Sequence, residues 1–218
     1  MERRLDLVAL AMGLAFAFMW SSAFTSARII VAEAPPLLSL SIRFALSGFF
    51  AVLIARAMGQ TWRLTRSQVA LTLVFGLCQN ALYLGLYFEA MQTVPASIAA
   101  ITASTMPLLV ALLSWAVLGQ KLPPLGWLGL AAGFTGVALI LGLRMTGGAD
   151  LHGLALCIGG VIALAVATLV MRGASSGGNL LMVVGYQMFV GAIALVSVGS
   201  VLETWDVTWS PRLIGALA

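Results

Sequence analysis

Long apolar stretches, separated by short polar or proline-containing breaks, run along the whole chain. A helical membrane span needs about 20 apolar residues, because the bilayer core is about 30 Å thick and an α-helix rises about 1.5 Å per residue. The predicted spans are Leu5–Val31, Pro35–Met58, Ser67–Met91, Pro95–Leu118, Pro123–Leu143, Leu151–Met171 and Asn179–Leu202, with the start of an eighth at Pro211. The pattern therefore predicts an all-α, polytopic membrane protein.

Prolines mark the clearest span boundaries. Pro35 or Pro36, Pro95, Pro123 and Pro211 each stand near a predicted helix start. The missing backbone N–H costs little there, because the first helical turn has no acceptor for it within the helix. These four starts are the firmest of the predicted boundaries.

Composition agrees with a location in lipid. Hydrophobic residues make up 61% of the 218 residues and charged residues 8%, against about 45–50% and about 25% in soluble domains. The net charge is +4, but no run of Lys and Arg is longer than the pair Arg3 and Arg4. We therefore expect no nucleic-acid partner. The first apolar stretch is longer than the 7–15 residues typical of a signal-peptide core, so we interpret it as a retained span.

The distribution of cations predicts the orientation, because cytoplasmic loops carry an excess of Lys and Arg. With the N-terminus inside, the inner side holds Arg3, Arg4, Arg56, Arg63, Arg66, Lys121 and Arg172, and the outer side holds Arg28, Arg144 and Arg212. This bias predicts a cytoplasmic N-terminus. The loops around Glu33, Thr93, Thr146 and Trp205 are then expected outside.

The chain also repeats itself. Asp6 and Arg28 recur 144 positions later, and Gly48, Thr61, Trp62 and Thr65 recur 143 positions later as Gly191, Thr204, Trp205 and Thr208. A unit of five spans is odd in number, so the second copy would enter the membrane from the opposite face, as in many secondary transporters. We expect inverted five-helix repeats, the first at residues 1–146 and an incomplete second at 147–218, continuing for about 72 residues past Ala218.

Polar residues gather near the middle of several spans, where they are costly and usually face a bundle interior or a cavity. They are Trp20, Ser21 and Ser22 in the first span, Gln79 and Asn80 in the third, and Thr102, Ser104 and Thr105 in the fourth. Transporter sites are built at this depth. Trp20 either packs inertly or stacks on a substrate.

The third span places Gly76, Asn80, Tyr83 and Tyr87 at spacings of 4, 3 and 4, which puts them on one face of an α-helix. Two interpretations remain open. Either this face lines a pocket, or Asn80 hydrogen-bonds a neighbouring helix as structural glue.

The fourth span contains Pro107, which has no N–H and leaves the Ala103 carbonyl without its helical partner. Either the span simply kinks with Thr105 or a nearby helix absorbing the change, or the freed carbonyl faces a cavity.

Arg43 lies eight residues past Pro35, about 12 Å along the helix at about 1.5 Å per residue. Its guanidinium would reach the outer surface, pair with Glu89, or bind a substrate carboxylate. Glu89 is one of few carboxylates inside a span, so facilitated diffusion and antiport both stay open.

Short motifs follow one another in a characteristic order. They are Trp20-Ser21-Ser22-Ala23-Phe24, Pro35-Pro36, Arg43-Phe44, Ala81-Leu82-Tyr83-Leu84-Gly85-Leu86-Tyr87, Pro95-Ala96-Ser97-Ile98-Ala99-Ala100, Met106-Pro107-Leu108-Leu109 and Leu118-Gly119-Gln120-Lys121. In this order they resemble the drug/metabolite transporter superfamily, specifically the EamA-type ten-helix permeases. Gln120 departs from the usual acid of that family, and Leu164 stands where the second repeat often has Trp.

The resemblance implies movement of small metabolites across the inner membrane, commonly outward. We therefore predict a secondary transporter of small metabolites such as amino acids or related compounds, with a small-molecule substrate and the lipid bilayer as its partners. No cofactor and no metal are expected, and the oligomeric state is left open. The predicted substrate-binding residues are Trp20, Ser21, Arg43, Asn80, Tyr83, Tyr87 and Thr105.

Other functions have less support in the sequence. An intramembrane enzyme is disfavoured because His152 is the only histidine and no HExxH, GxSxG or midplane carboxylate pair occurs. A seven-span receptor would not be expected to repeat itself. A structural or regulatory membrane subunit stays as the alternative.

Overall fold

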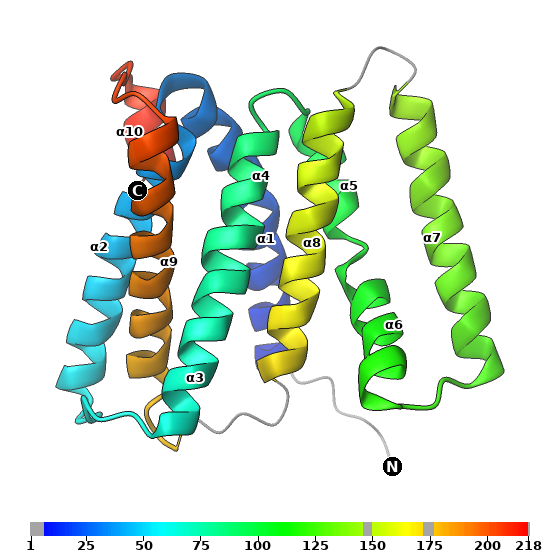
Figure 1. Cartoon of the computed structure of the whole chain (residues 1–218), viewed down its shortest axis with the longest axis horizontal. Coiled ribbons are helices and arrows are strands. Elements are labelled where there is room, and N and C mark those ends of the chain that lie inside the picture. The colour runs from blue at the N-terminus through cyan, green and yellow to red at the C-terminus, as the bar shows by residue number, and fades with distance from the viewer. Residues whose placement is uncertain (1–6, 146–149, 172–176, 218) are drawn as a thin grey trace.

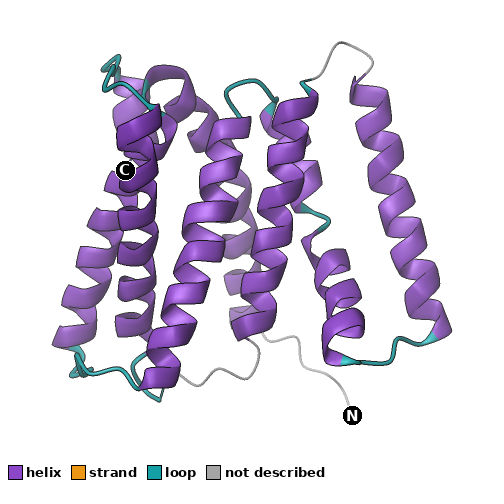
Figure 2. Ribbon diagram, viewed as in Figure 1, coloured by secondary structure: helices purple, strands orange, loops and turns teal. Residues whose placement is uncertain are grey.

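The structure is a computed structural model that describes residues 7–145, 150–171 and 177–217, and all regular structure in these ranges is helical (Figure 2). The helices are α1 (Leu7–Glu33), α2 (Pro36–Ala57), α3 (Arg66–Phe75), η1 (Gly76–Tyr83), α4 (Leu84–Ala90), α5 (Ala96–Ala103), α6 (Met106–Leu118), α7 (Pro124–Met145), α8 (Leu151–Met171), α9 (Leu180–Leu202) and α10 (Pro211–Leu217).

Seven helical segments in the described ranges are long and apolar enough to cross a membrane. α3, η1 and α4 form one of them, and α5 and α6 together form another. This confirms the predicted polytopic all-α fold. The proline starts are also confirmed, since α2 begins at Pro36, α10 begins at Pro211, and Pro95 is the N-cap of α5.

Successive spans run in opposite directions through the bundle (Figure 1). The α2–α3 and α6–α7 loops lie at one end, and the α1–α2, α4–α5 and α9–α10 loops lie at the other (Figure 1). This alternation matches the predicted grouping of those loops. Asp6, the cations Arg3, Arg4 and Arg172, the Thr146 loop and the repeat boundary at 146–147 lie outside the described residues.

The third span is not the continuous α-helix that the sequence predicts. Residues Gly76–Tyr83 form a π-helix, in which hydrogen bonds run from i to i+5. The angle per residue is therefore smaller, and spacings of 4, 3 and 4 no longer place four side chains on one face. Gly76 and Asn80 contact α9, whereas Tyr83 and Tyr87 contact α8.

The fourth span is interrupted rather than kinked. α5 ends at Ala103 and α6 begins at Met106, which leaves Ser104 and Thr105 between the two helices. Pro107 then lies in the first turn of α6, where a backbone N–H would have no intrahelical acceptor, so its absence costs no helical hydrogen bond. The Thr105 hydroxyl donates to the Thr102 carbonyl at 2.7 Å, so Thr105 stabilises the break locally.

α2 and α9 pack more extensively than any other pair of helices. Small residues allow this, because close backbone approach is the main source of helix association in lipid. A Cβ at Gly48 of α2 would lie 3.0 Å from the Gly185 carbonyl oxygen of α9. On another side of α9, a Cβ at Gly191 would lie only 2.4 Å from the Cβ of Asn80.

At each end of the α2–α9 pair, a side chain that follows the end of one helix caps the start of the other helix. At one end, the Glu203 carboxylate accepts from the backbone N–H groups of Leu37 and Leu38 at 2.8 and 2.9 Å. At the opposite end, the Gln60 side-chain carbonyl accepts from the N–H of Met182 at 3.0 Å. Glu203 follows Gln60 by 143 positions, the same offset as Thr204 after Thr61. Corresponding positions of the two segments therefore cap each other's helices.

The remaining helices lie around this pair. α10 is held to the end of α1, because the Glu33 carboxylate accepts from the Ser210 hydroxyl and the Glu33 carbonyl accepts from the Thr208 N–H. α7 stands at the edge of the bundle (Figure 1). Gly133 of α7 lies against Leu108, whereas a Cβ at Gly129 would meet no atom within 4 Å.

Candidate functional site

A cavity of about 250 Å³ opens between α1, α2 and the η1–α4 span. We call it the aromatic cavity. Its lining residues are Trp20, Ala23, Phe24, Ala27, Leu40, Arg43, Phe44, Ser47, Gln79, Tyr83, Leu84, Tyr87, Phe88, Met91 and Met188. Trp20 and Gln79 lie near the middle of their spans, so the cavity reaches the depth at which transporters bind their substrates.

α1 and α2 form two walls by the same helical rule. α1 contributes Trp20, Ala23, Phe24 and Ala27, which are spaced i, i+3, i+4 and i+7 and therefore share a face. α2 contributes the equivalent set beginning at Leu40, which includes Arg43. Trp20 is 41% exposed, so its ring stands at the open side of the cavity.

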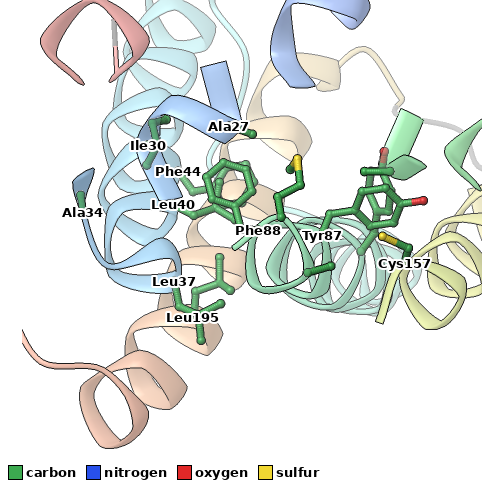
Figure 3. Packing of buried hydrophobic residues seen from close by; sticks show 14 of the residues in the cluster. Ala27, Ile30, Ala34, Leu37, Leu40, Phe44, Tyr87, Phe88, Cys157 and Leu195 are labelled. Carbon is green, nitrogen blue, oxygen red and sulfur yellow. The ribbon is translucent and has the colours of Figure 1, made fainter. Parts of the chain in front are cut away.

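The η1–α4 span forms the third wall with aromatic rings that are tilted against one another. The rings of Tyr83 and Tyr87 lie 4.7 Å apart between centroids, and Phe24 of α1 lies 6.4 Å from Tyr87. Figure 3 shows Tyr87 beside Cys157 and Phe88 beside Phe44. The Tyr87 ring fits there because a Cβ at Gly160 of α8 would lie only 2.7 Å from it.

Two buried polar groups near the site have no hydrogen-bond partner in the described structure. They are the Tyr87 hydroxyl and the side-chain nitrogen of Gln187. A buried hydroxyl without a partner costs free energy. Tyr87 is therefore held in this wall by the packing of its ring and not by a hydrogen bond of its hydroxyl.

Arg43 is the single charged side chain among the described residues that line the aromatic cavity. It is partly buried, and none of the hydrogen bonds or ion pairs within the described residues engages it. Of the three alternatives for Arg43, pairing with Glu89 is not observed, because no ion pair within the described residues joins the two and Glu89 lines a different groove. The guanidinium thus faces the cavity with its donors unused.

Ser21 lines a neighbouring space instead. A cavity of about 410 Å³ between α1 and α5, which we call the hydroxyl cavity, shares Trp20 and Phe24 with the aromatic cavity. Its other lining residues are Ser21, Thr25, Ala96, Ser97, Ala100, Ala103 and Ser104. The rings of Trp20 and Phe24 therefore divide an aromatic space from a hydroxyl-rich one.

Asn80 and Thr105 do not line either cavity. Asn80 is 5% exposed and its amide donates to the Gln187 carbonyl at 2.9 Å. Thr105 is buried at the α5–α6 break. The geometry favours a packing role for both residues, because their polar atoms already bond to protein atoms.

A larger groove of about 830 Å³ lies on the other side of the η1–α4 span, between α8, α9 and the start of α2. We call it the acidic groove because Glu89 and Glu203 line it, together with Gln92 and His152. The Glu203 carboxylate is already committed to capping α2. The η1–α4 span therefore lies between the cavity that contains Arg43 and the groove that contains Glu89.

Sequence reasoning placed Gln79 at mid-depth but omitted it from the site, and it omitted Ser47 and Phe24. For Ser47 and Phe24 the signal was present, since each lies one helical turn from a predicted residue, Arg43 or Trp20. Gln79 carried the same signal, since it lies four residues before the predicted Tyr83, but the helical spacing did not choose between Gln79 and Asn80. The π-helix brings Gln79 to the cavity and Asn80 to α9.

At the start of α8, outside the membrane-spanning segments, Asp150 forms a local cap. The Thr93 hydroxyl donates to its carboxylate at 2.6 Å, and the N–H groups of His152 and Gly153 donate at 3.0 and 3.1 Å. The Thr93 hydrogen bond is the main cause that holds the pKa of Asp150 below its usual value. Within the described ranges, no cluster of three or more His, Cys, Asp or Glu side chains has metal-binding geometry.

Two uncharacterized bacterial transporters are similar to this chain. An uncharacterized transporter of Bacillus subtilis (strain 168), YvbV, is 27% identical over 91% of this chain and 65% of its own length. An uncharacterized transporter of Synechocystis, sll0355, is 25% identical over 56% of this chain and 37% of its own length. The chain therefore spans less than two thirds of the length of these relatives.

A protein of known crystal structure superposes with a TM-score of 0.61 at 19% identity, covering 91% of this chain and 72% of that one. The two therefore share a fold. The profile of the EamA-like transporter family matches residues 7–142, which include three complete walls of the aromatic cavity. This integral, multi-pass membrane protein belongs to the EamA-like transporter family.

Proposed function

We propose that the chain forms a secondary permease that moves small metabolites, amino acids or related compounds, through the aromatic cavity without converting them chemically. The observation that carries this proposal is a mid-depth cavity with an unpaired arginine, in a protein of a transporter family. Polar and charged groups at this depth usually mark a substrate pathway.

The reciprocal caps on α2 and α9 support an inverted-repeat organisation, with the first repeat at 1–146 and part of the second at 147–218. A two-fold relation between repeats requires that contacts occur in pairs, residue i with j′ and i′ with j. The Gln60 and Glu203 caps have this form. In such transporters the site lies at the repeat interface, and alternating access comes from rocking one repeat against the other.

We place the N-terminus in the cytoplasm on the basis of the cation bias, and the protein in the bacterial inner membrane on the basis of its similarity to the EamA-like transporter family. Single-cysteine labelling tests the orientation, in a background that lacks Cys78 and Cys157. A cysteine at Arg63 should react with a membrane-impermeant reagent only after permeabilisation. Labelling of that cysteine in intact cells would contradict the orientation.

Transport is tested by counterflow in proteoliposomes with labelled amino acids, nucleobases and sugars. Ala23→Trp should abolish any exchange, because Ala23 lines the cavity and the indole would fill it. Ala131→Trp on the exposed surface of α7 is the matched control and should keep the wild-type rate. Counterflow that survives Ala23→Trp in folded protein would overturn a pathway through this cavity.

A further inference from the structure

We infer that the aromatic cavity selects a small organic monoanion, with a carboxylate on Arg43 and an apolar or aromatic body among the rings. This inference rests on the proposed pathway, and within its small metabolites it favours monocarboxylates over zwitterionic amino acids. Three observations support it: the charge balance of the cavity, the residues that surround the guanidinium, and the size and chemistry of the remaining walls.

The charge balance calls for one negative charge. Arg43 is partly buried and unpaired within the described residues, and none of the residues lining the cavity is a carboxylate. A charged side chain held away from water is stabilised by an opposite charge. A monoanion neutralises the site, whereas a dianion such as a phosphate monoester would leave a net negative charge in it.

The chemistry around the guanidinium suits a carboxylate. Arginine presents a planar fork of N–H donors that matches the two oxygens of a carboxylate. Ser47 lies one turn from Arg43 on the same face of α2, and Gln79 of η1 lines the same cavity. A hydroxyl and an amide add neutral donors for the second carboxylate oxygen.

The same set of residues disfavours a free amine or a zwitterion. The cavity offers an ammonium group aromatic faces but no carboxylate, because Glu89 and Glu203 lie in the acidic groove on the other side of the η1–α4 span. The aromatic cavity and the acidic groove therefore differ in sign, and α4 separates them. A substrate ammonium beside Arg43 would meet like charge.

The remaining walls define the body of the ligand. Aromatic rings and the thioethers of Met91 and Met188 surround the cavity. A volume of about 250 Å³ is about eight times the ~30 Å³ that a water occupies in the liquid. That space holds one ring with a short acidic arm, for which phenylacetate is a suitable probe.

Binding of labelled phenylacetate to the purified chain tests the inference, with phenylacetamide, phenethylamine and phenylalanine as competitors. Phenylacetate should bind at least tenfold more tightly than each competitor. Arg43→Gln should lower phenylacetate affinity at least tenfold and leave phenylacetamide affinity unchanged. Arg43→Lys should give an intermediate loss, because an ammonium offers charge without the fork. Arg63→Gln, an exposed position, is the matched control and should behave as wild type.

Several outcomes would overturn the inference. These are failure of phenylacetate to bind the wild-type chain, equal binding of phenylacetamide, or tighter binding of phenethylamine or phenylalanine. The wild-type comparison decides the question even if Arg43→Gln fails to fold. If Ala23→Trp abolishes counterflow of a neutral or zwitterionic substrate, the monoanion class falls and the proposed pathway stands. If counterflow survives Ala23→Trp, the proposed pathway itself falls.

Discussion

α9 and α1 are both membrane-length helices of similar composition, yet they are packed differently. Of the α9 span, 39% is buried inside the bundle, against 17% of the α1 span. α9 meets α2 and η1 through glycines, Gln60 caps its start, and Glu203 at its end caps α2. α1 instead exposes Trp20 and lines two cavities.

The difference shows how this bundle divides its tasks. Lipid tails are as apolar as leucine, so helices associate through close packing and hydrogen bonds rather than through hydrophobic burial. The α2–α9–η1 interface supplies both, and it fixes the wall that carries Arg43 and Gln79. α1 packs loosely, which leaves room for a ligand beside that wall.

The largest expected effect comes from disturbing the tight interface. A Cβ at Gly76 would lie 2.8 Å from both the Gln187 carbonyl oxygen and the Val190 Cβ of α9. Gly76→Val should therefore lower the free energy of unfolding by about 3 kcal/mol, at the upper end of overpacking effects. Gly129→Val on α7 has open space and should change stability little. Equal melting temperatures of the two variants in detergent would refute the contrast.

The two reciprocal caps should contribute unequally to the free energy of unfolding. Glu203→Ala leaves two N–H groups of α2 unpaired and should cost about 2 kcal/mol, whereas Gln60→Ala leaves one N–H of α9 unpaired and should cost about 1 kcal/mol. Glu203→Gln keeps one acceptor oxygen and should fall between the wild type and Glu203→Ala. Chemical unfolding in mixed micelles measures the order, and a larger loss for Gln60→Ala would contradict it.

Substitutions at Asn80 and Tyr87 distinguish a packing role from a role in ligand contact. Asn80→Ala removes one interhelical hydrogen bond and should cost about 0.6 kcal/mol, the average for such bonds in membranes. Tyr87→Phe removes a buried hydroxyl without a partner and should leave stability equal or slightly higher. Transport per folded molecule should be unchanged for Asn80→Ala. A specific transport defect at normal melting temperature would instead return Asn80 to the binding site.

The smallest effect concerns the exposed cap at α8, in contrast to the interface caps. Because the pKa of Asp150 is held below its usual value, the folded state binds this proton less readily than the unfolded state. Its stabilising contribution is therefore complete above about pH 4 and is lost as the pH falls through the lowered value. The melting-temperature difference between wild type and Asp150→Asn should be constant near neutral pH and shrink below about pH 4. A difference that grows in acid would reverse the assigned sign.

The sequence was sufficient for the spans and for part of the cavity. Apolar length and proline positions locate helix starts because both act locally. Trp20, Arg43, Tyr83 and Tyr87 were found because polar and aromatic groups at mid-depth stand out in an apolar helix, and all four line the aromatic cavity.

Local sequence pattern could not predict that Gln79 lines the aromatic cavity and that Asn80 contacts α9 instead. The choice between i to i+4 and i to i+5 hydrogen bonding in Gly76–Tyr83 accompanies contacts with α9, in which Gly76 and Asn80 meet Gln187. Those contacts join residues 107 positions apart. Local periodicity contains no information about such a partner.

The cap formed by Glu203 also has a consequence for biosynthesis. Leu38 and Glu203 are 165 positions apart, and ribosomes add about 5–20 residues per second, so α2 waits roughly ten to thirty seconds for its cap. Gln60 waits for Met182 over 122 positions in the same way. Neither half can complete its helix ends alone during translation. The α2–α9 pair is therefore fully capped only once the end of α9 has been synthesised.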